Sequence, residues 1–354
     1  MGELDLGQDF VGPEALTQFL SAWGPVAHPL IVTRGTVKER YLDAVVASLE
    51  LNSYKVFSEF TPCPQLSQVE RFPKSQLPEF DTIIALGGGS AFDCAKALKY
   101  QWVQSLPEGR AQVQAQSLPL ITVATTFGSG AELTPFAVIY TEKGKVSLSA
   151  PYLAPAACIM VPQFGLSVPQ RQRATAGVDC LCQAIEAFWS KSATLESKAD
   201  ALECIKLSLT ALKPAVLSDD VTYQTLMARA SILSGKAITV GRTTAAHALS
   251  YYFTQYHGVA HGHAVALIMR TLFARNLPLV RDGAKLLAAL GLSSAGQFKP
   301  WLEGLLTELG LESSFAYLKL GPTELERALA SVNLARLGNN PAPLAESDLR
   351  ALIN

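Results

Sequence analysis

The sequence lacks the features that mark nucleic-acid-binding, membrane-bound and secreted proteins. Its 354 residues carry a net charge of −1 and contain no basic block, so it has no electrostatic footprint of a nucleic-acid or membrane-surface binder. No apolar run reaches about 18 residues, the length that spans a bilayer. The first residues are acidic and carry no signal-like apolar segment. We therefore expect no nucleic-acid partner and no membrane association.

Cysteine is scarce and scattered. The six cysteines lie mostly in apolar segments, and Cys180 and Cys182 are two residues apart, so they form no CxxC motif. This usage indicates reduced thiols in a cytoplasmic protein. No internal repeat or low-complexity segment is visible, and 49% of the residues are hydrophobic. A chain of this length and composition can bury a large core and form two domains.

Glycine is concentrated where a predicted strand meets a predicted helix. The apolar run Thr82–Leu86 predicts a buried parallel strand, Gly87, Gly88 and Gly89 follow it, and a helical pattern covers 91–104. Glycine lets the backbone approach a ligand closely, and the N–H groups and dipole at a helix N-terminus favour an anion. We interpret this stretch as a phosphate-binding turn, although it has neither the GxGxxG nor the P-loop spacing. A tight turn without a ligand is the alternative.

Strand and helix patterns alternate through residue 162, which predicts a doubly wound α/β domain. A second glycine-bearing turn, Thr125–Gly130, leaves the same carboxyl edge of the sheet, where ligands bind in such folds. Lys145 is expected in a hairpin-like link between the last two strands. The predicted strands are 29–33, 54–57, 82–86, 118–124, 137–140 and 156–161, and the predicted helices are 37–51, 65–73 and 91–104.

Strand signals stop after Pro162, and long helical patterns fill 168–354. Ser167 has the capping-box spacing of a helix start, and an early proline follows it. We place the domain boundary here, with an α/β dinucleotide-binding domain over 1–163 and an all-helical metal- and substrate-binding domain over 164–354.

Histidine is rare, yet four of the five histidines fall within seventeen residues: His247, His257, His261 and His263. Asp179 and Gln183 lie four apart in an apolar helical segment and therefore share one helix face. One aspartate with two histidines makes a three-ligand site for a divalent metal, with a fourth position open to polarise a substrate oxygen. Alternatively, Asp179 pairs locally and the histidines are hydrogen-bonded loop residues.

Taken together, these stretches resemble the iron-containing (group III) alcohol dehydrogenase family, which is related in fold to glycerol dehydrogenase and dehydroquinate synthase. Gly87–Lys96 matches the family's GGGSxxDxAK, and Thr125–Thr134 resembles its TTxGTGSExT. Gly177–Glu186 resembles GxDALxHAIE, and His247 and His261, fourteen apart, match the outer histidines of HAxxHxLG…PHG. The motifs occur in the family's order over nearly the whole chain.

The resemblance implies a dehydroquinate synthase-like architecture, in which a Rossmann-like N-terminal domain and a helical C-terminal domain enclose a cleft. It also implies a dimer or larger assembly. The pyrophosphate of NAD or NADP would lie on Gly87, Gly88, Gly89 and Ser90. The rest of the cofactor site would be lined by Asp93, Thr125, Thr126, Ser129 and Lys145. A divalent metal, Fe²⁺ or Zn²⁺, would be held by Asp179, His247 and His261.

Two positions depart from the family's pattern. Gln183 stands where the iron enzymes usually have a histidine ligand. Either Gln183 binds the metal weakly, or the site has three protein ligands, as in the glycerol dehydrogenase branch; a metal-free member is a further alternative. Tyr251 replaces the inner histidine, which lies close to substrate and nicotinamide in relatives.

Cofactor and substrate choice depend on single charged residues. Arg34, after the first predicted strand, stands where relatives often carry an aspartate, and a cation there would accept the 2′-phosphate of NADP(H). The motif details are similar to the phosphonoacetaldehyde reductases, which make 2-hydroxyethylphosphonate. Lys236 and Arg242, with Thr243 and Thr244, could supply donors to a phosphonate. Alternatively, Arg34, Lys236 and Arg242 are solvated surface charges.

The resulting hypothesis is reversible hydride transfer between nicotinamide and an aldehyde carbonyl that is polarised by the metal. Tyr251, His257 and His263 are the candidates for delivering the proton. The alternatives are a dehydroquinate-synthase-like lyase that uses the cofactor catalytically, a simple-alcohol or polyol dehydrogenase of the same family, and a cofactor-binding sensor without turnover.

Overall fold

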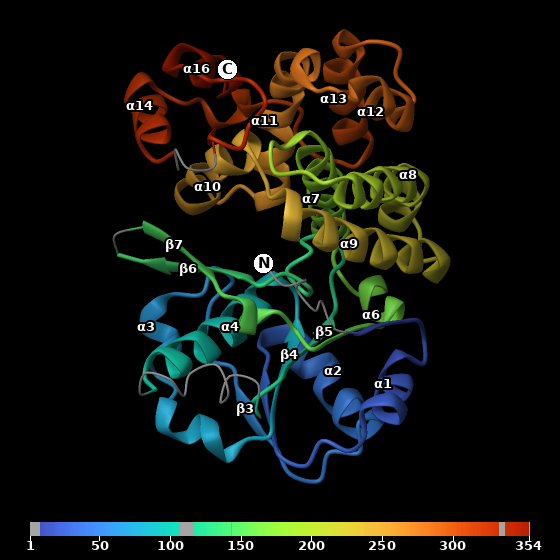
Figure 1. The fold of residues 1–354 in the computed structure, drawn as a ribbon, viewed down its shortest axis with the longest axis vertical. Coiled ribbons are helices and arrows are strands. Elements are labelled where there is room, and N and C mark those ends of the chain that lie inside the picture. Colours follow the sequence, from blue (N-terminus) through green and yellow to red (C-terminus); the bar gives the residue numbers. More distant parts are fainter. Residues whose placement is uncertain (1–7, 107–116, 143, 333–336, 354) are drawn as a thin grey trace. The chain divides into compact units, whose positions relative to one another are not determined.

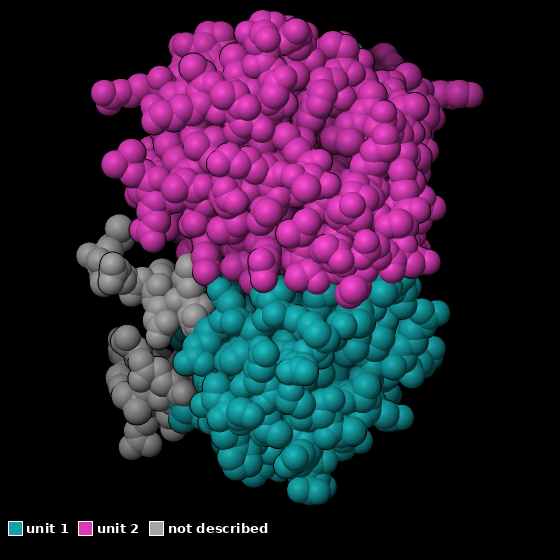
Figure 2. All heavy atoms as spheres, turned by 90° about the vertical axis from the view of Figure 1, so that its right-hand side faces the viewer, with its two compact units in different colours: residues 1–167 teal, residues 168–354 magenta. Residues whose placement is uncertain are grey.

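The computed structural model describes residues 8–106, 117–142, 144–332 and 337–353 of the chain. Two compact units, Met1–Ser167 and Val168–Asn354, are drawn in teal and magenta in Figure 2. Among the described residues, no helix has both the length and the apolar character needed to cross a membrane.

The first unit is built on a six-stranded parallel sheet with the order β1-β8-β5-β4-β2-β3. All residues of β2, β4, β5 and β8 are buried, as expected where helices cover both faces of a parallel sheet. The predicted α/β fold of this half is confirmed. The strands are β1 (Gln8–Val11), β2 (Pro29–Val32), β3 (Lys55–Phe57), β4 (Thr82–Gly87), β5 (Leu120–Ala124) and β8 (Ala157–Met160).

Helices lie on both sides of this sheet (Figure 1). Ile31, Ile84 and Ile121 come from three neighbouring strands and belong to the core cluster that also contains Phe19 of α1 and Val45 of α2. The helices are α1 (Ala15–Trp23), α2 (Gly35–Ser48), α3 (Leu66–Val69), α4 (Gly89–Gln104) and α6 (Pro162–Leu166), with 3-10 turns η1 (Lys74–Glu79) and η2 (Pro151–Leu153).

The register of the sheet brings the two glycine-bearing turns together. Gly87 at the end of β4 pairs with Ala124 at the end of β5. The next amide, that of Thr125, donates to the Gly87 carbonyl at 2.8 Å. Both turns therefore start side by side at the carboxyl edge of the sheet, as the strand pattern predicts.

Several local expectations for this unit are wrong. Lys145 is not in a link between sheet strands: it lies in β7 (Gly144–Ser149), which pairs with β6 (Phe136–Thr141) as a separate antiparallel hairpin. β7 is partly exposed and alternates polar residues with only two apolar ones, Val146 and Leu148, which is a short strand pattern that the sequence prediction did not include. The strand β1 also went unpredicted. The helix expected over 65–73 ends at Val69, because Phe72 precedes a proline, which disfavours helical backbone there.

The second unit is helical throughout its described ranges, 168–332 and 337–353, which confirms the predicted all-α half. Its helices are α7 (Gln170–Trp189), α8 (Leu195–Leu217), α9 (Val221–Gly241), α10 (Ala245–His257), α11 (His261–Asn276), α12 (Gly283–Leu290), α13 (Phe298–Glu308), α14 (Pro322–Ala330) and α16 (Glu346–Ile353). Short 3-10 turns are η3 (Leu277–Leu279), η4 (Ala295–Gln297) and η5 (Phe315–Leu318).

Helix α7 is the central element of this unit, packed against α8, α9 and α11 (Figure 1). All thirteen residues from Gly177 to Trp189 are buried. The predicted cap at Ser167 is wrong: α7 begins at Gln170 after Pro169, with no side-chain cap. The Ser167 hydroxyl instead donates to the carbonyl of Phe164, because Ser167 ends α6.

Candidate metal centre and cofactor-binding turn

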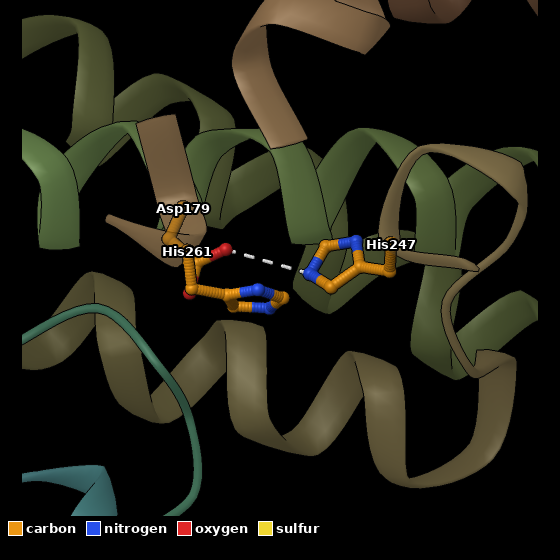
Figure 3. Close-up of side chains that lie close together, drawn as sticks. All are labelled: Asp179, His247 and His261. Carbon is orange, nitrogen blue, oxygen red and sulfur yellow. Dashed lines mark ion pairs between the residues drawn. The ribbon is translucent and has the colours of Figure 1, made fainter. Parts of the chain in front are cut away.

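Three helices of the second unit bring one carboxylate and two imidazoles together. Asp179 comes from α7, His247 from α10 and His261 from the first turn of α11 (Figure 3). One ligand atom from each residue lies within 4.8 Å of the others. Residues 68 and 14 positions apart in the sequence therefore converge, as the motif spacing implies.

A close contact between α11 and α7 sets this convergence. A Cβ atom at Gly262 would lie 2.1 Å from the Thr175 carbonyl oxygen and 2.5 Å from the Asp179 Cβ, so only glycine fits here. The neighbouring residue, His261, is thereby held beside Asp179. The close packing of α11 on α7 therefore explains why the last motif needs glycine at Gly262 in this chain.

The donor atoms fit a bound cation. Asp179 Oδ1 and His247 Nε2 face each other at 3.4 Å, the ion pair drawn in Figure 3. Both atoms are buried, and neither has a hydrogen-bond partner among the described residues. Buried polar atoms are nearly always satisfied in native structures. A divalent metal between the carboxylate and the imidazoles would satisfy both atoms, and a carboxylate with two imidazoles is a donor set that Fe²⁺ and Zn²⁺ accept.

Glu186 fixes the tautomer of His247. Its carboxylate is fully buried, accepts from Thr244 Oγ1 at 2.6 Å and from the Ala246 amide at 2.9 Å, and contacts His247 Nδ1. Burial would raise the pKa of Glu186, but His247 and Thr244 outweigh it and lower that pKa. An ionised carboxylate only accepts, so Nδ1 carries the proton and Nε2 presents its lone pair to the metal position.

Without a metal, the neighbouring carboxylates favour a proton on that lone pair. Burial acts to lower the pKa of His247, but the carboxylates of Glu186 and Asp179 outweigh it and raise the pKa to about 9. A metal ion would take the place of this proton between the same two groups.

Ser250 gives His261 the matching orientation. Ser250 Oγ donates to the His247 carbonyl at 2.9 Å and lies 3.3 Å from His261 Nδ1. Because the Ser250 proton is used, the hydroxyl can accept from Nδ1–H of His261, the tautomer in which Nε2 would serve as the ligand atom. The Tyr251 ring stacks on the His261 ring with centroids 5.1 Å apart, so this substituted position lies directly at the centre.

Gln183 lies beside Asp179 as its helical spacing predicts. Its amide nitrogen donates to Asp179 Oδ2 at 3.2 Å, and its carbonyl oxygen accepts from Ser234 Oγ at 2.8 Å. That Gln183 binds the metal stays a prediction.

Sequence reasoning gave no role to Glu186, Ser250 or Ser234. For Glu186 a signal existed: Asp179, Gln183 and Glu186 follow the i, i+4, i+7 spacing and so lie on one face of α7. Ser250 and Ser234 carry no comparable signal, because serine is common and their roles depend on tertiary contacts.

The other proposed proton donors lie in different surroundings. His263 is buried, its Nε2 lies 2.7 Å from the Glu312 carbonyl oxygen, and burial lowers its pKa. His257 ends α10, with Nε2 3.9 Å from a Glu324 carboxylate oxygen. Their roles in proton transfer stay predictions.

The two predicted substrate cations both lie toward the C-terminal end of α9, six residues apart. Lys236 is half-buried. Its charge acts to lower the pKa of the Asp200 carboxyl, but burial is the larger effect and raises that pKa. Arg242 is exposed and ends α9 with a positive φ of 65°. The contact of either side chain with substrate stays a prediction.

In the first unit, the glycine turn has the geometry of a phosphate cradle. Gly87 has a φ of 152°, and α4 begins at Gly89. A Cβ at Gly88 would lie 2.5 Å from Thr126 Oγ1, so glycine keeps this approach open. Thr125 Oγ1 is buried and without a hydrogen-bond partner among the described residues, which suits a hydroxyl that contacts a ligand.

Each of the remaining predicted cofactor residues has a partner within the first unit. Ser90 Oγ donates to the Pro62 carbonyl at 3.0 Å, and Ser129 Oγ accepts from the Ala131 amide at 3.3 Å. Burial raises the pKa of Asp93 to about 6, opposed by Lys96 and Lys145. The Arg34 guanidinium lies 5.9 Å from the centre of the Phe60 ring. Their roles in cofactor binding stay predictions.

Buried Lys96, within the first predicted motif, supports the turn. Its ammonium group donates to the carbonyls of Ala131 and, at 2.9 Å, Phe136. It thereby ties α4 to the segment that follows the second turn.

Comparison with known proteins finds relatives of this chain in sequence and in fold. The chain is 28% identical over 348 residues to long-chain-alcohol dehydrogenase 1 of Geobacillus thermodenitrificans, covering 92% of this chain and 88% of that protein. It is 34% identical over 211 residues to the phosphonoacetaldehyde reductase of Streptomyces viridochromogenes, covering 55% and 53%. The solved alcohol dehydrogenase of Oenococcus oeni has the same fold, with a TM-score of 0.87, 23% identity, and coverage of 98% and 97%.

Family models match both halves of the chain. The model described as iron-containing alcohol dehydrogenase matches residues 10–162, and that of the Fe-containing alcohol dehydrogenase family, C-terminal, matches residues 173–354. The resemblance drawn from the motifs is thereby confirmed. This chain belongs to the iron-containing alcohol dehydrogenase family of oxidoreductases.

Proposed function

We propose that the protein catalyses metal-dependent, NAD(P)H-linked reduction of an aldehyde to a primary alcohol, in reversible fashion. The observation that carries this proposal is the buried pair of unsatisfied ligand atoms, Asp179 Oδ1 and His247 Nε2, with His261 beside them. Such a cluster inside an alcohol dehydrogenase family member supports a working metal centre.

When bound, a divalent metal supplies a Lewis acid for the carbonyl oxygen, and NAD(P)H supplies the hydride. Asp179, His247 and His261 would hold the metal, and Glu186 and Ser250 keep both imidazoles in the ligating tautomer. The glycine turn at Gly87–Gly89 would bind the cofactor's pyrophosphate through backbone N–H groups at the start of α4.

We assign the proton that reaches the alcohol oxygen to Tyr251. Its ring stacks on His261, whereas the Nε2 of His263 is occupied by the Glu312 carbonyl. A phenol at this position can deliver a proton to an alkoxide, either directly or through water.

For the cofactor we propose NADP(H), with Arg34 as the acceptor of the 2′-phosphate. Arg34 directly precedes α2 after strand β2, the place where such folds read the ribose. Two buried hydroxyls at this carboxyl edge, those of Thr33 and Thr125, have no hydrogen-bond partner among the described residues, which supports a ligand there.

For the substrate we propose phosphonoacetaldehyde, the aldehyde of 2-hydroxyethylphosphonate. The 34% identity to a phosphonoacetaldehyde reductase supports it. Arg242, with Thr243 and Thr244, comes shortly before His247 and could offer donors to a phosphonate, and Lys236 is the second proposed cation. A simple-alcohol dehydrogenase is the second candidate, favoured by the 92% coverage of this chain in its match to a long-chain-alcohol dehydrogenase.

Metal analysis and an aldehyde panel test the proposal together. Metal-stripped protein is reloaded with Fe²⁺ or Zn²⁺ and assayed with phosphonoacetaldehyde and with uncharged aldehydes, using NADPH and NADH. The proposal expects metal-dependent oxidation of NADPH, fastest with phosphonoacetaldehyde. A lyase would consume its substrate with no net change in NAD(P)H, and a sensor would bind NADP(H) without turnover.

Assembly and location complete the proposal. We infer a homodimer or larger in the cytoplasm, from the family resemblance and the reduced cysteines. Size-exclusion chromatography with light scattering measures the number of chains in the assembly.

A further inference from the structure

Gln183 occupies an unusual place, because it touches the ligand carboxylate from the side. Its amide nitrogen donates to Asp179 Oδ2 at 3.2 Å, and the other carboxylate oxygen, Oδ1, faces His247. The two residues are one helical turn apart on α7, so this contact needs no distortion of the helix.

Asp179 fixes the direction of the Gln183 amide, and Ser234 holds its oxygen. This serine on α9 is fully buried, and its hydroxyl donates to Gln183 Oε1 at 2.8 Å. The reverse orientation would place Oε1 against Asp179 Oδ2, two acceptors in contact, whereas a serine hydroxyl can pair with either end of the amide. The acceptor-only carboxylate of Asp179 therefore selects the observed orientation.

We propose that Gln183 and Ser234 form a positioning pair for Asp179 and that Gln183 is not a metal ligand. The pair holds Oδ2 so that Oδ1 alone points at the metal position. The Gln183 oxygen accepts from Ser234 on α9, and the atom that meets Asp179 is the amide nitrogen, which donates and offers no lone pair to a metal. The protein's ligand set is then one carboxylate and two imidazoles. This inference rests on the proposed metal-dependent function, and it names residues that set the geometry of the metal centre.

A measurement of metal affinity tests this positioning pair and does not require catalytic turnover. Gln183→Met removes the amide at similar volume, and Ser234→Ala removes only the hydrogen bond that holds the amide oxygen. Loss of such supporting contacts lowers metal affinity by about 10–100-fold. We expect Gln183→Met to weaken Co²⁺ binding, measured by chelator competition, by that factor, and Ser234→Ala to weaken it by less.

Gln224 offers a matched control. Like Gln183 it is a buried glutamine, 3% exposed against 4%, but its amide nitrogen donates to the Ala215 carbonyl at 2.7 Å. Gln224→Met should leave Co²⁺ affinity unchanged. Thermal unfolding of each metal-free variant shows whether it folds. If Gln183→Met does not fold, the Co²⁺ affinity of Ser234→Ala is compared with that of Gln224→Met instead. A Gln183→Met protein that folds and binds Co²⁺ as tightly as Gln224→Met overturns the inference.

A crystal structure of the Zn²⁺-loaded wild type gives the direct reading. We expect Gln183 Oε1 on Ser234 and Nε2 on Asp179, with neither atom bound to zinc. An Oε1–Zn distance of about 2.0–2.2 Å would overturn this inference and leave the proposed function intact. A wild-type protein that binds no Zn²⁺ or Co²⁺ would overturn both.

Discussion

Replacing Glu186 by glutamine tests the tautomer argument with the smallest chemical change. One oxygen of Glu186 accepts from Thr244 and Ala246, and the other contacts His247 Nδ1. In Glu186→Gln the oxygen stays with its two donors, so the new NH₂ group faces Nδ1. Two donors cannot pair, and His247 must move its proton to Nε2, the atom that faces the metal position.

The expected result is a loss of metal affinity rather than of fold. Disturbing such a contact to a ligand costs about 10–100-fold in affinity, which corresponds to about 1.4–2.7 kcal/mol. Chelator competition with Co²⁺ measures it. Glu303→Gln is the control, since Glu303 of α13 pairs at 2.9 Å with buried Arg270, which lies nine residues after His261 on α11, and this ion pair includes none of the proposed ligands. The reasoning is refuted if Glu186→Gln folds and binds Co²⁺ as tightly as the control.

Three further predictions follow from other contacts. Because His247 has a pKa of about 9 without metal, a metal must displace its proton, so metal affinity should rise about tenfold per pH unit up to pH 9; an affinity independent of pH between 7 and 9 would contradict this. Gly262→Ala should destabilise the protein by about 1–3 kcal/mol and weaken metal binding, because its Cβ would meet α7. Gly304→Ala, at a helical position where nothing lies within 4 Å of the added Cβ, should change neither the free energy of unfolding nor the metal affinity. Chemical denaturation measures the first quantity, and chelator competition measures the second. Lys96→Met should lower the free energy of unfolding by about 1–3 kcal/mol for each of the two carbonyls that loses its hydrogen bond. The pKa of Lys96 is lowered to about 8 by burial, so wild-type stability should rise from pH 8 toward 10.5, a slope that Lys96→Met flattens.

The sequence predicts the overall fold well because its signals are local. Buried strands such as β4 are continuous apolar runs, and the glycines after it mark a backbone that must turn sharply. β7 is missed because its pattern is short: only Val146 and Leu148 alternate with polar residues in this partly exposed hairpin strand. Motif order, rather than periodicity, identifies which histidines join Asp179.

The supporting residues of the metal centre are harder to predict. Glu186 shares a helix face with Asp179, but its partner His247 is 61 residues away, and only the packing of α10 on α7 brings them together. Ser234 and Gln183 are 51 residues apart, and their bond depends on how α9 packs on α7. Spacing within one helix cannot specify contacts between helices.

X-ray absorption at the zinc edge tests the central claim most directly. Metal-stripped protein loaded with one Zn²⁺ per chain should show a first shell containing two imidazoles, from His247 and His261, and oxygen from Asp179. Each of His247→Ala and His261→Ala should lose one imidazole from that shell. Failure to retain one zinc per chain, or a shell without imidazoles, would contradict the account.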